Sequence, residues 1–223
     1  MSDHQNIKLE MSKVLKVFIG RVMWMKSVYY IYQALYEQKE DRNLLEEIAL
    51  SFFSDLNKIL KEYLTLEFCK ITDPPQSLGG KNSNVTVDYF VEKLKDTGIC
   101  DNSELKKYQE ELKNFTEQLK EARHKRIAHL DYEMNVERGN ESLGAFEEGL
   151  EKIFLKNLWD FCNYLSEKID GHIRGEFSPV QRGDVQDLLD ILLKAVAFQR
   201  LPGSIIEEKH DILYQVNKEM VAK

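Results

Sequence analysis

Apolar residues recur three or four positions apart over long stretches of this chain. The most regular series places all its members on one face of an α-helix: Leu105, Tyr108, Leu112, Phe115, Leu119 and Ala122. Strict alternation of three and four also favours close packing of that face against another helix. Only 4 Pro and 11 Gly occur in 223 residues, which favours long helices over strands. The sequence therefore predicts an all-α fold.

The same periodicity divides the chain into helices of unequal length. The first two, 9–38 and 44–71, are long, and only the polar run 39–43 separates them, so we expect antiparallel neighbours. Pro and Gly concentrate in a predicted loop at 72–84. The expected architecture is a helical bundle of about six helices. Three further helices are predicted with N-terminal caps: one capped by Asn84 or Thr86 and running to Lys95, one capped by Ser103, and one capped by Asp184 and running to Leu201. Another helix is predicted from Leu143 to Ile173, and an amphipathic piece from Ile205 to Met220.

The two long predicted helices differ in how their apolar residues are placed. In the first, Trp24 lies off the main apolar stripe, so we expect cover on more than one side. Gly20 is either tolerated within the helix at a cost of about 1 kcal/mol against alanine or marks a close helix crossing. In the second, the predicted buried stripe is Ile48, Phe52, Leu56, Ile59, Tyr63 and Leu66.

Composition limits the class of protein. Hydrophobic residues make up 43% of the chain, enough for a substantial core. The three cysteines show no paired C-x-x-C spacing, which fits neither a disulfide framework nor a zinc site, and we expect no metal and no cofactor. We expect neither a signal peptide nor a membrane segment. These features predict a cytoplasmic location.

Charge further restricts any role with nucleic acid. The net charge of −7 is the wrong sign for coating nucleic acid by bulk attraction, so such a role needs a local basic patch. The segment 120–130 provides one, with four Lys or Arg residues against a single acid. The apolar alternation of the preceding helix continues onto Arg126 and His129. With Arg123, these side chains fall within an arc of about 120° and can converge on one ligand.

A structural explanation of this segment stays open. Basic residues in the last turns of a helix complement its negative end, and they can also pair with acids on neighbouring helices. In favour of a functional explanation, a guanidinium group and an imidazole at a packing face are costly unless they meet a partner or line a cleft.

The run Arg123-His124-Lys125-Arg126-Ile127-Ala128-His129 resembles the R-x(4–6)-H signature of HEPN domains. Arg123 matches the motif arginine, His129 the motif histidine, and His124 the position after the arginine, where this family favours Asn, Asp or His. The continuation to Asp131 looks like the abortive-infection, AbiU-like branch. HEPN domains are helical bundles that carry this signature near the end of a long helix. Asp73-Pro74 and Asn84-Val85-Thr86-Val87 are also similar to that group.

The resemblance covers roughly residues 29–165. We expect a HEPN-like bundle over 1–175 and a C-terminal helical extension, 176–223, packed on the same domain.

The resemblance implies a metal-independent endoribonuclease with an antiviral or toxin-like role. It implies a homodimer whose motif helices face one composite cleft, and it leaves room for an inhibitory protein partner. RNA suits this chemistry because its 2′-hydroxyl group can attack the adjacent phosphate. In that scheme His129, with an unperturbed pKa of about 6.5, serves as general acid or base, and Arg123 binds the phosphate. We add Arg126 as a second phosphate contact, and His124 could orient the arginine or the substrate.

Two other functions stay open. A non-catalytic helical module could hold a nucleotide, RNA or a protein partner in the same basic cleft. Alternatively, the helix end is plain packing, and substitutions there alter stability alone.

Overall fold

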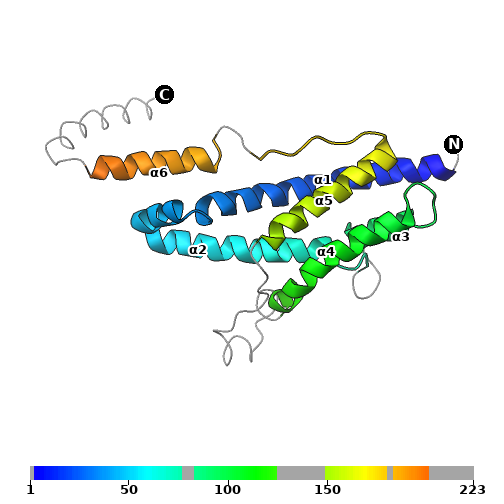
Figure 1. Cartoon of the computed structure of the whole chain (residues 1–223), viewed down its shortest axis with the longest axis horizontal. Helices are drawn as coiled ribbons and strands as arrows, with labels where there is room; N and C mark the ends of the chain where they lie inside the picture. Colours follow the sequence, from blue (N-terminus) through cyan, green and yellow to red (C-terminus); the bar gives the residue numbers. More distant parts are fainter. Residues whose placement is uncertain (1–2, 77–82, 125–148, 180–182, 201–223) are drawn as a thin grey trace. The chain divides into compact units, whose positions relative to one another are not determined.

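The computed structural model describes residues 3–76, 83–124, 149–179 and 183–200. Six helices form in these ranges, and the β-type pairing found there is one isolated bridge, Gln76 to Ser83. The all-α prediction is confirmed. The helices are α1 (Asp3–Tyr36), α2 (Lys39–Ile71), α3 (Val87–Leu94), α4 (Asn102–Ala122), α5 (Leu150–Asp170) and α6 (Val185–Gln199) (Figure 1). Within the described ranges, every helix is too short or too polar to cross a membrane.

Local sequence explains several helix ends. Thr86 caps α3, because its hydroxyl oxygen accepts from the Tyr89 N–H, and the Asp184 carboxylate caps α6 by accepting from the Gln186 N–H. Both caps were predicted. The predicted Ser103 cap is wrong: Asp101 caps α4, and its carboxylate accepts from the N–H groups of Ser103 and Glu104. A carboxylate at this position also complements the positive end of the helix.

Backbone contacts divide the chain into two compact units. The larger contains residues 1–30 and 58–179, and the smaller contains 31–57 and 180–223. Both long helices, α1 and α2, contribute to each unit. The expectation that 176–223 forms an extension on the same domain stays a prediction.

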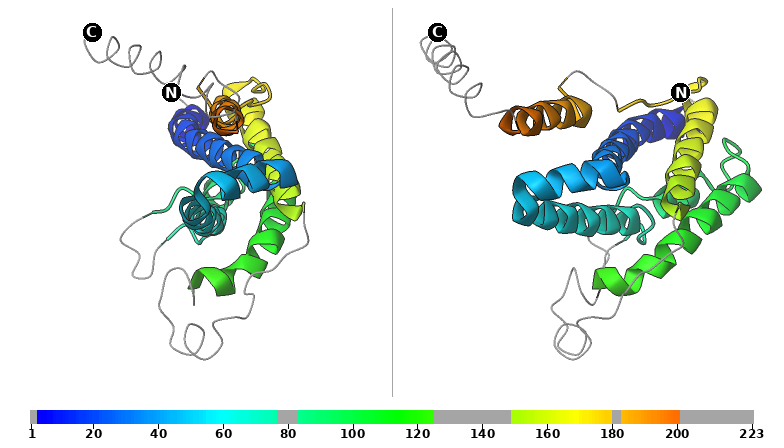
Figure 2. Two further views of the ribbon diagram at one scale, coloured as in Figure 1. Left: turned by 90° about the vertical axis from the view of Figure 1, so that its left-hand side faces the viewer. Right: turned by 60° about the vertical axis from the view of Figure 1, so that its left-hand side comes forward.

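Within the larger unit, α1 and α2 run antiparallel and side by side (Figure 1, Figure 2). Arg21 pairs with Glu67 at 3.0 Å, and the Trp24 indole N–H donates to the Tyr63 hydroxyl group at 2.8 Å, so the numbering rises in one helix as it falls in the other. This confirms the predicted antiparallel arrangement for the larger unit. Trp24 is nevertheless 58% exposed, and no described heavy atom beyond the neighbouring backbone of α1 lies within 4 Å of the position that a Cβ at Gly20 would take. Among the described residues Trp24 therefore lacks the expected cover, and Gly20 marks no close helix crossing, which favours the alternative that it is tolerated within the helix.

Two aromatic clusters form the core of the larger unit. Phe18, Phe90 and Phe161 bring α1, α3 and α5 together, with ring centroids 5.2–6.3 Å apart in edge-to-face geometry. The second cluster contains Phe68 of α2, Phe115 of α4 and Phe154 of α5, and their centroids are 4.7–5.7 Å apart. Together the clusters connect all five helices of the unit.

The buried side of α2 differs from the predicted stripe. Phe52 and Ile59 are 63% and 60% exposed, whereas Phe53, Leu64 and Phe68 are buried. The backbone leaves helical geometry at Ala49 (φ −159°, ψ 69°), so the segments before and after it do not share one continuous helical face. The predicted break at 39–43 is also wrong: these residues are helical, and the turn lies at Glu37 and Gln38.

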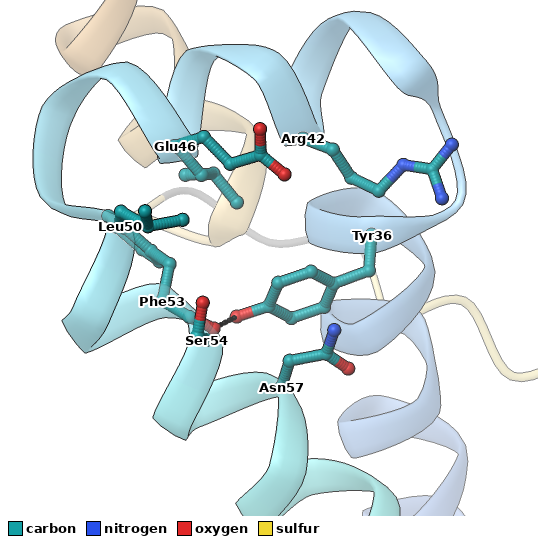
Figure 3. Close-up of a pocket in the computed structure, with 8 residues that line it drawn as sticks. Tyr36, Arg42, Glu46, Leu50, Phe53, Ser54 and Asn57 are labelled. Atoms are coloured by element: carbon teal, nitrogen blue, oxygen red, sulfur yellow. Dashed lines mark hydrogen bonds between the residues drawn. The ribbon is translucent and has the colours of Figure 1, made fainter.

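In the smaller unit, polar contacts join segments that are far apart in sequence. The Arg200 guanidinium group donates to both carboxylate oxygens of Glu47 at 2.7 Å. The Tyr36 hydroxyl group donates to the carbonyl oxygen of Phe53 at 2.8 Å (Figure 3). Beside this bond lies a small pocket of about 60 Å³, lined by Tyr36, Arg42, Leu45, Glu46, Leu50, Phe53, Ser54 and Asn57. Its charged residues are exposed.

Truncation of Phe161 tests the core. Its side chain is fully buried and contacts aromatic rings of three other elements, so Phe161→Ala should lower the free energy of unfolding by about 3–5 kcal/mol. Urea unfolding measures this loss. Ile173→Ala is the control, because Ile173 is exposed and its truncation should change stability by less than about 0.5 kcal/mol. Equal losses in the two variants would contradict this assignment of the core.

The buried carboxylate of Glu67 makes stability depend on pH. Burial alone would raise the pKa of Glu67, but hydrogen bonds from Lys70 and Arg21 outweigh it and lower the pKa below its usual value. The ionised Glu67 carboxylate therefore stabilises the fold fully at pH values above its pKa in the unfolded chain. This stabilisation is lost as the pH falls through the lower pKa of Glu67 in the folded protein.

We expect Glu67→Gln to lose about 1–3 kcal/mol at pH 7, and the difference from the parent should shrink between about pH 5 and pH 3. Chemical unfolding across that range measures it, with the exposed Glu92→Gln as control. A difference that stays constant with pH would show that the Glu67 charge is not responsible.

Candidate nucleic-acid site at the end of α4

The apolar face of α4 packs as the sequence predicted. Leu105, Leu112, Phe115 and Leu119 are all buried, and α4 lies against α5. Arg123 follows directly on this face and keeps right-handed helical geometry (φ −57°, ψ −49°). Its backbone N–H donates to the carbonyl groups of Leu119 and Lys120. The backbone of Arg123 is therefore fixed by a well-packed helix.

The side chain of Arg123 forms an ion pair with Asp73, which follows α2. The Nη1 atom lies 2.5 Å from Oδ1, and the side chains are 24% and 27% exposed. The pair is thus accessible to solvent at its edge. This contact is what the structural explanation of the basic segment anticipates: a helix-end arginine paired with an acid from a neighbouring helix.

A buried hydrogen bond also joins the end of α2 to α4. The hydroxyl groups of Thr72 and Thr116 lie 2.6 Å apart, and both residues are buried. Thr72 is adjacent to Asp73, and Thr116 lies two helical turns before Arg123. Because buried polar groups are costly unless paired, this bond favours one alignment of the two helix ends.

The other basic side chains at this end of α4 differ in their surroundings. Lys120 pairs with Glu117 at 2.5 Å on the same helix, and His124 is exposed. Arg126 and His129 lie outside the described residues, as does the predicted continuation of the helical face onto them. The roles assigned to Arg123, His124, Arg126 and His129 stay predictions, as do the absence of a metal and of a cofactor.

Asp73 is the residue that sequence reasoning missed. It was noted only as part of the Asp73-Pro74 resemblance, without a role. Fifty positions separate it from Arg123, so no local periodicity can pair them. The available signal was an acid at the end of a predicted helix, immediately before two prolines.

These features are those of a HEPN-type protein: an all-α bundle with an arginine of an R-x(4–6)-H segment at the end of a regular helix. The family model HEPN_AbiU2, described as AbiU2, matches residues 13–188. The chain therefore belongs to the AbiU2 family of abortive-infection HEPN proteins. The match is wider than the predicted span of 29–165 and extends into α6. No curated protein and no solved structure matches the chain significantly.

The thiol groups near and beyond this site should be unreactive in the folded protein. Burial raises the pKa of Cys69 to about 11, and the nearby positive charge of Arg123 opposes that rise without cancelling it. Burial also raises the pKa of Cys100 to about 11 and strongly raises that of Cys162.

Since the thiolate is the reactive form, we expect each thiol to react with Ellman's reagent at pH 8 at least about 100-fold more slowly than in the unfolded chain. Rapid labelling of one thiol in the folded protein would contradict its burial.

Proposed function

We propose that this AbiU2-family protein is a metal-independent endoribonuclease that acts in antiviral defence. The observation that carries the proposal is the placement of Arg123, the motif arginine, at the partly exposed end of a well-packed helix. A guanidinium group has five N–H donors, and the ion pair with Asp73 occupies one of its nitrogens. The remaining donors can bind a phosphate group.

In this mechanism the protein moves protons and stabilises charge. His129 takes the proton from the 2′-hydroxyl group, whose oxygen attacks the adjacent phosphorus atom. The bond to the 5′-oxygen breaks, and that oxygen receives a proton from water, which leaves a 2′,3′-cyclic phosphate and a 5′-hydroxyl group. Arg123 stabilises the negative charge that grows on the phosphate oxygens, with Arg126 as a second contact and His124 orienting the arginine or the RNA.

Dimerisation, an inhibitory partner and a cytoplasmic location belong to the same proposal. Two copies of the segment 123–129 would form one composite cleft. A nuclease that cleaves cellular RNA also needs a control, and a protein partner that covers this cleft would provide it.

A second candidate function is phosphate binding without cleavage. The observation in its favour is the carboxylate already paired with Arg123. A site whose arginine has a counter-ion can exchange it for an RNA or nucleotide phosphate without any chemical step.

The decisive measurement is cleavage of a mixed RNA substrate in the presence of a chelator. We expect the parent to cleave, and we expect Arg123→Ala and His129→Ala each to lower kcat/KM by about 10²–10⁴-fold. Arg42→Ala and His172→Ala are matched controls, because both residues are exposed and lie outside the motif segment. RNA binding without cleavage, lost in Arg123→Ala but kept in His129→Ala, would favour the binding module. If Arg123→Ala and His129→Ala alter only the stability of the protein, the end of α4 has a purely structural role.

A further inference from the structure

We propose that Asp73 is a positioning residue for Arg123, and that its negative charge also weakens RNA binding. The inference rests on the proposed ribonuclease function and adds a residue to it. Asp73 holds the guanidinium group where the RNA phosphate arrives, and its carboxylate remains beside that phosphate. The first effect raises kcat, and the second lowers the affinity for RNA.

Asp73 is itself firmly placed. Its backbone N–H donates to the carbonyl group of Lys70 at 3.4 Å, and the following proline restricts its backbone. Asn84 donates from its backbone N–H to the Pro75 carbonyl group at 2.7 Å and from its side chain to the Pro74 carbonyl group at 3.2 Å. The Asp73 carboxylate therefore belongs to a backbone segment, residues 73–75, that hydrogen bonds hold at both of its ends.

The ion pair leaves part of the arginine available. Among the described residues, Asp73 contacts Arg123 through one guanidinium nitrogen, and about a quarter of each side chain is exposed. A free arginine side chain loses considerable rotational freedom when it binds a phosphate. An arginine already held by a carboxylate loses less, so the geometry needed in the transition state is set before RNA binds.

The same carboxylate must repel the RNA backbone. A phosphate bound to Arg123 lies close to Asp73, because both groups contact one guanidinium. Like charges at this separation oppose binding, and the effect weakens with added salt. Removal of the Asp73 charge should thus tighten RNA binding even as it loosens the arginine.

Asp73→Asn separates this role from a merely structural one. We expect kcat to fall by about 10-fold. We also expect a decrease of about 2–5-fold in KM and in the Kd for a non-cleavable 2′-O-methyl RNA at low salt. Asp73→Glu restores the charge, so KM and Kd should return to the parent values and kcat should recover in part. Should Asp73→Asn fail to fold, Asp73→Ser removes the same charge with a smaller side chain, and the same fall in kcat, KM and Kd is expected of it.

Asp88→Asn is the matched control. Asp88 pairs with Lys113 across α3 and α4 at 2.7 Å, and it lies outside the motif segment. Its substitution should lower stability without this opposed change in kcat and KM.

The outcomes separate the two claims. A parent that cleaves RNA, with Asp73→Asn unchanged in kcat and Kd, removes the inference and leaves the proposed function standing. A higher kcat in Asp73→Asn also overturns the inference, because Asp73 would then inhibit Arg123. A parent that cleaves no RNA removes the proposed function and the inference with it.

Discussion

The packing of three phenylalanine rings from α2, α4 and α5 is the contact on which the candidate site depends. Phe68 lies just over one helical turn before Asp73, and Phe115 lies about two turns before Arg123. Once these rings pack with Phe154, the ends of α2 and α4 must meet. The buried Thr72–Thr116 hydrogen bond then favours one alignment, in which Asp73 and Arg123 form their ion pair. The position of the motif arginine is thus a consequence of apolar packing more than of charge.

Much of this arrangement follows from the sequence, and the exceptions have physical causes. The regular α4 face was predicted because only one side of that helix is apolar. The buried side of α2 was predicted wrongly, because Phe52 and Phe53 are adjacent and both apolar. The non-helical backbone at Ala49 also shifts the helical face between the segments before and after it. Thr86 and Asp184 were recognised as caps, whereas Asp101 was overlooked beside Ser103. The Asp73–Arg123 pair depends on tertiary packing and could not come from any local pattern.

The acidic protein and its proposed RNA ligand carry charges of the same sign. The net charge of −7 disfavours nucleic acid at long range, and Asp73 adds to that at short range. Under the proposed function, a few arginine and histidine side chains would bind RNA weakly, and the small number of phosphate contacts would make the affinity fall only modestly with added salt. Within the same proposal, weak binding by a single copy would favour a dimer with one composite cleft, since two motif segments would present twice the positive charge to the RNA.

The division of the chain into two interleaved units has a consequence for its synthesis. The smaller unit combines residues 31–57 with residues that follow 179, and the Arg200–Glu47 contact spans 153 positions. A ribosome releases the first of these segments long before the second. The smaller unit therefore cannot be completed until α6 has emerged, whereas every segment of the larger unit is already available by then. Residues 31–57 therefore cannot make their contacts with the segment after residue 179 until that segment has been synthesised. The rate of translation thus helps to determine when the smaller unit folds.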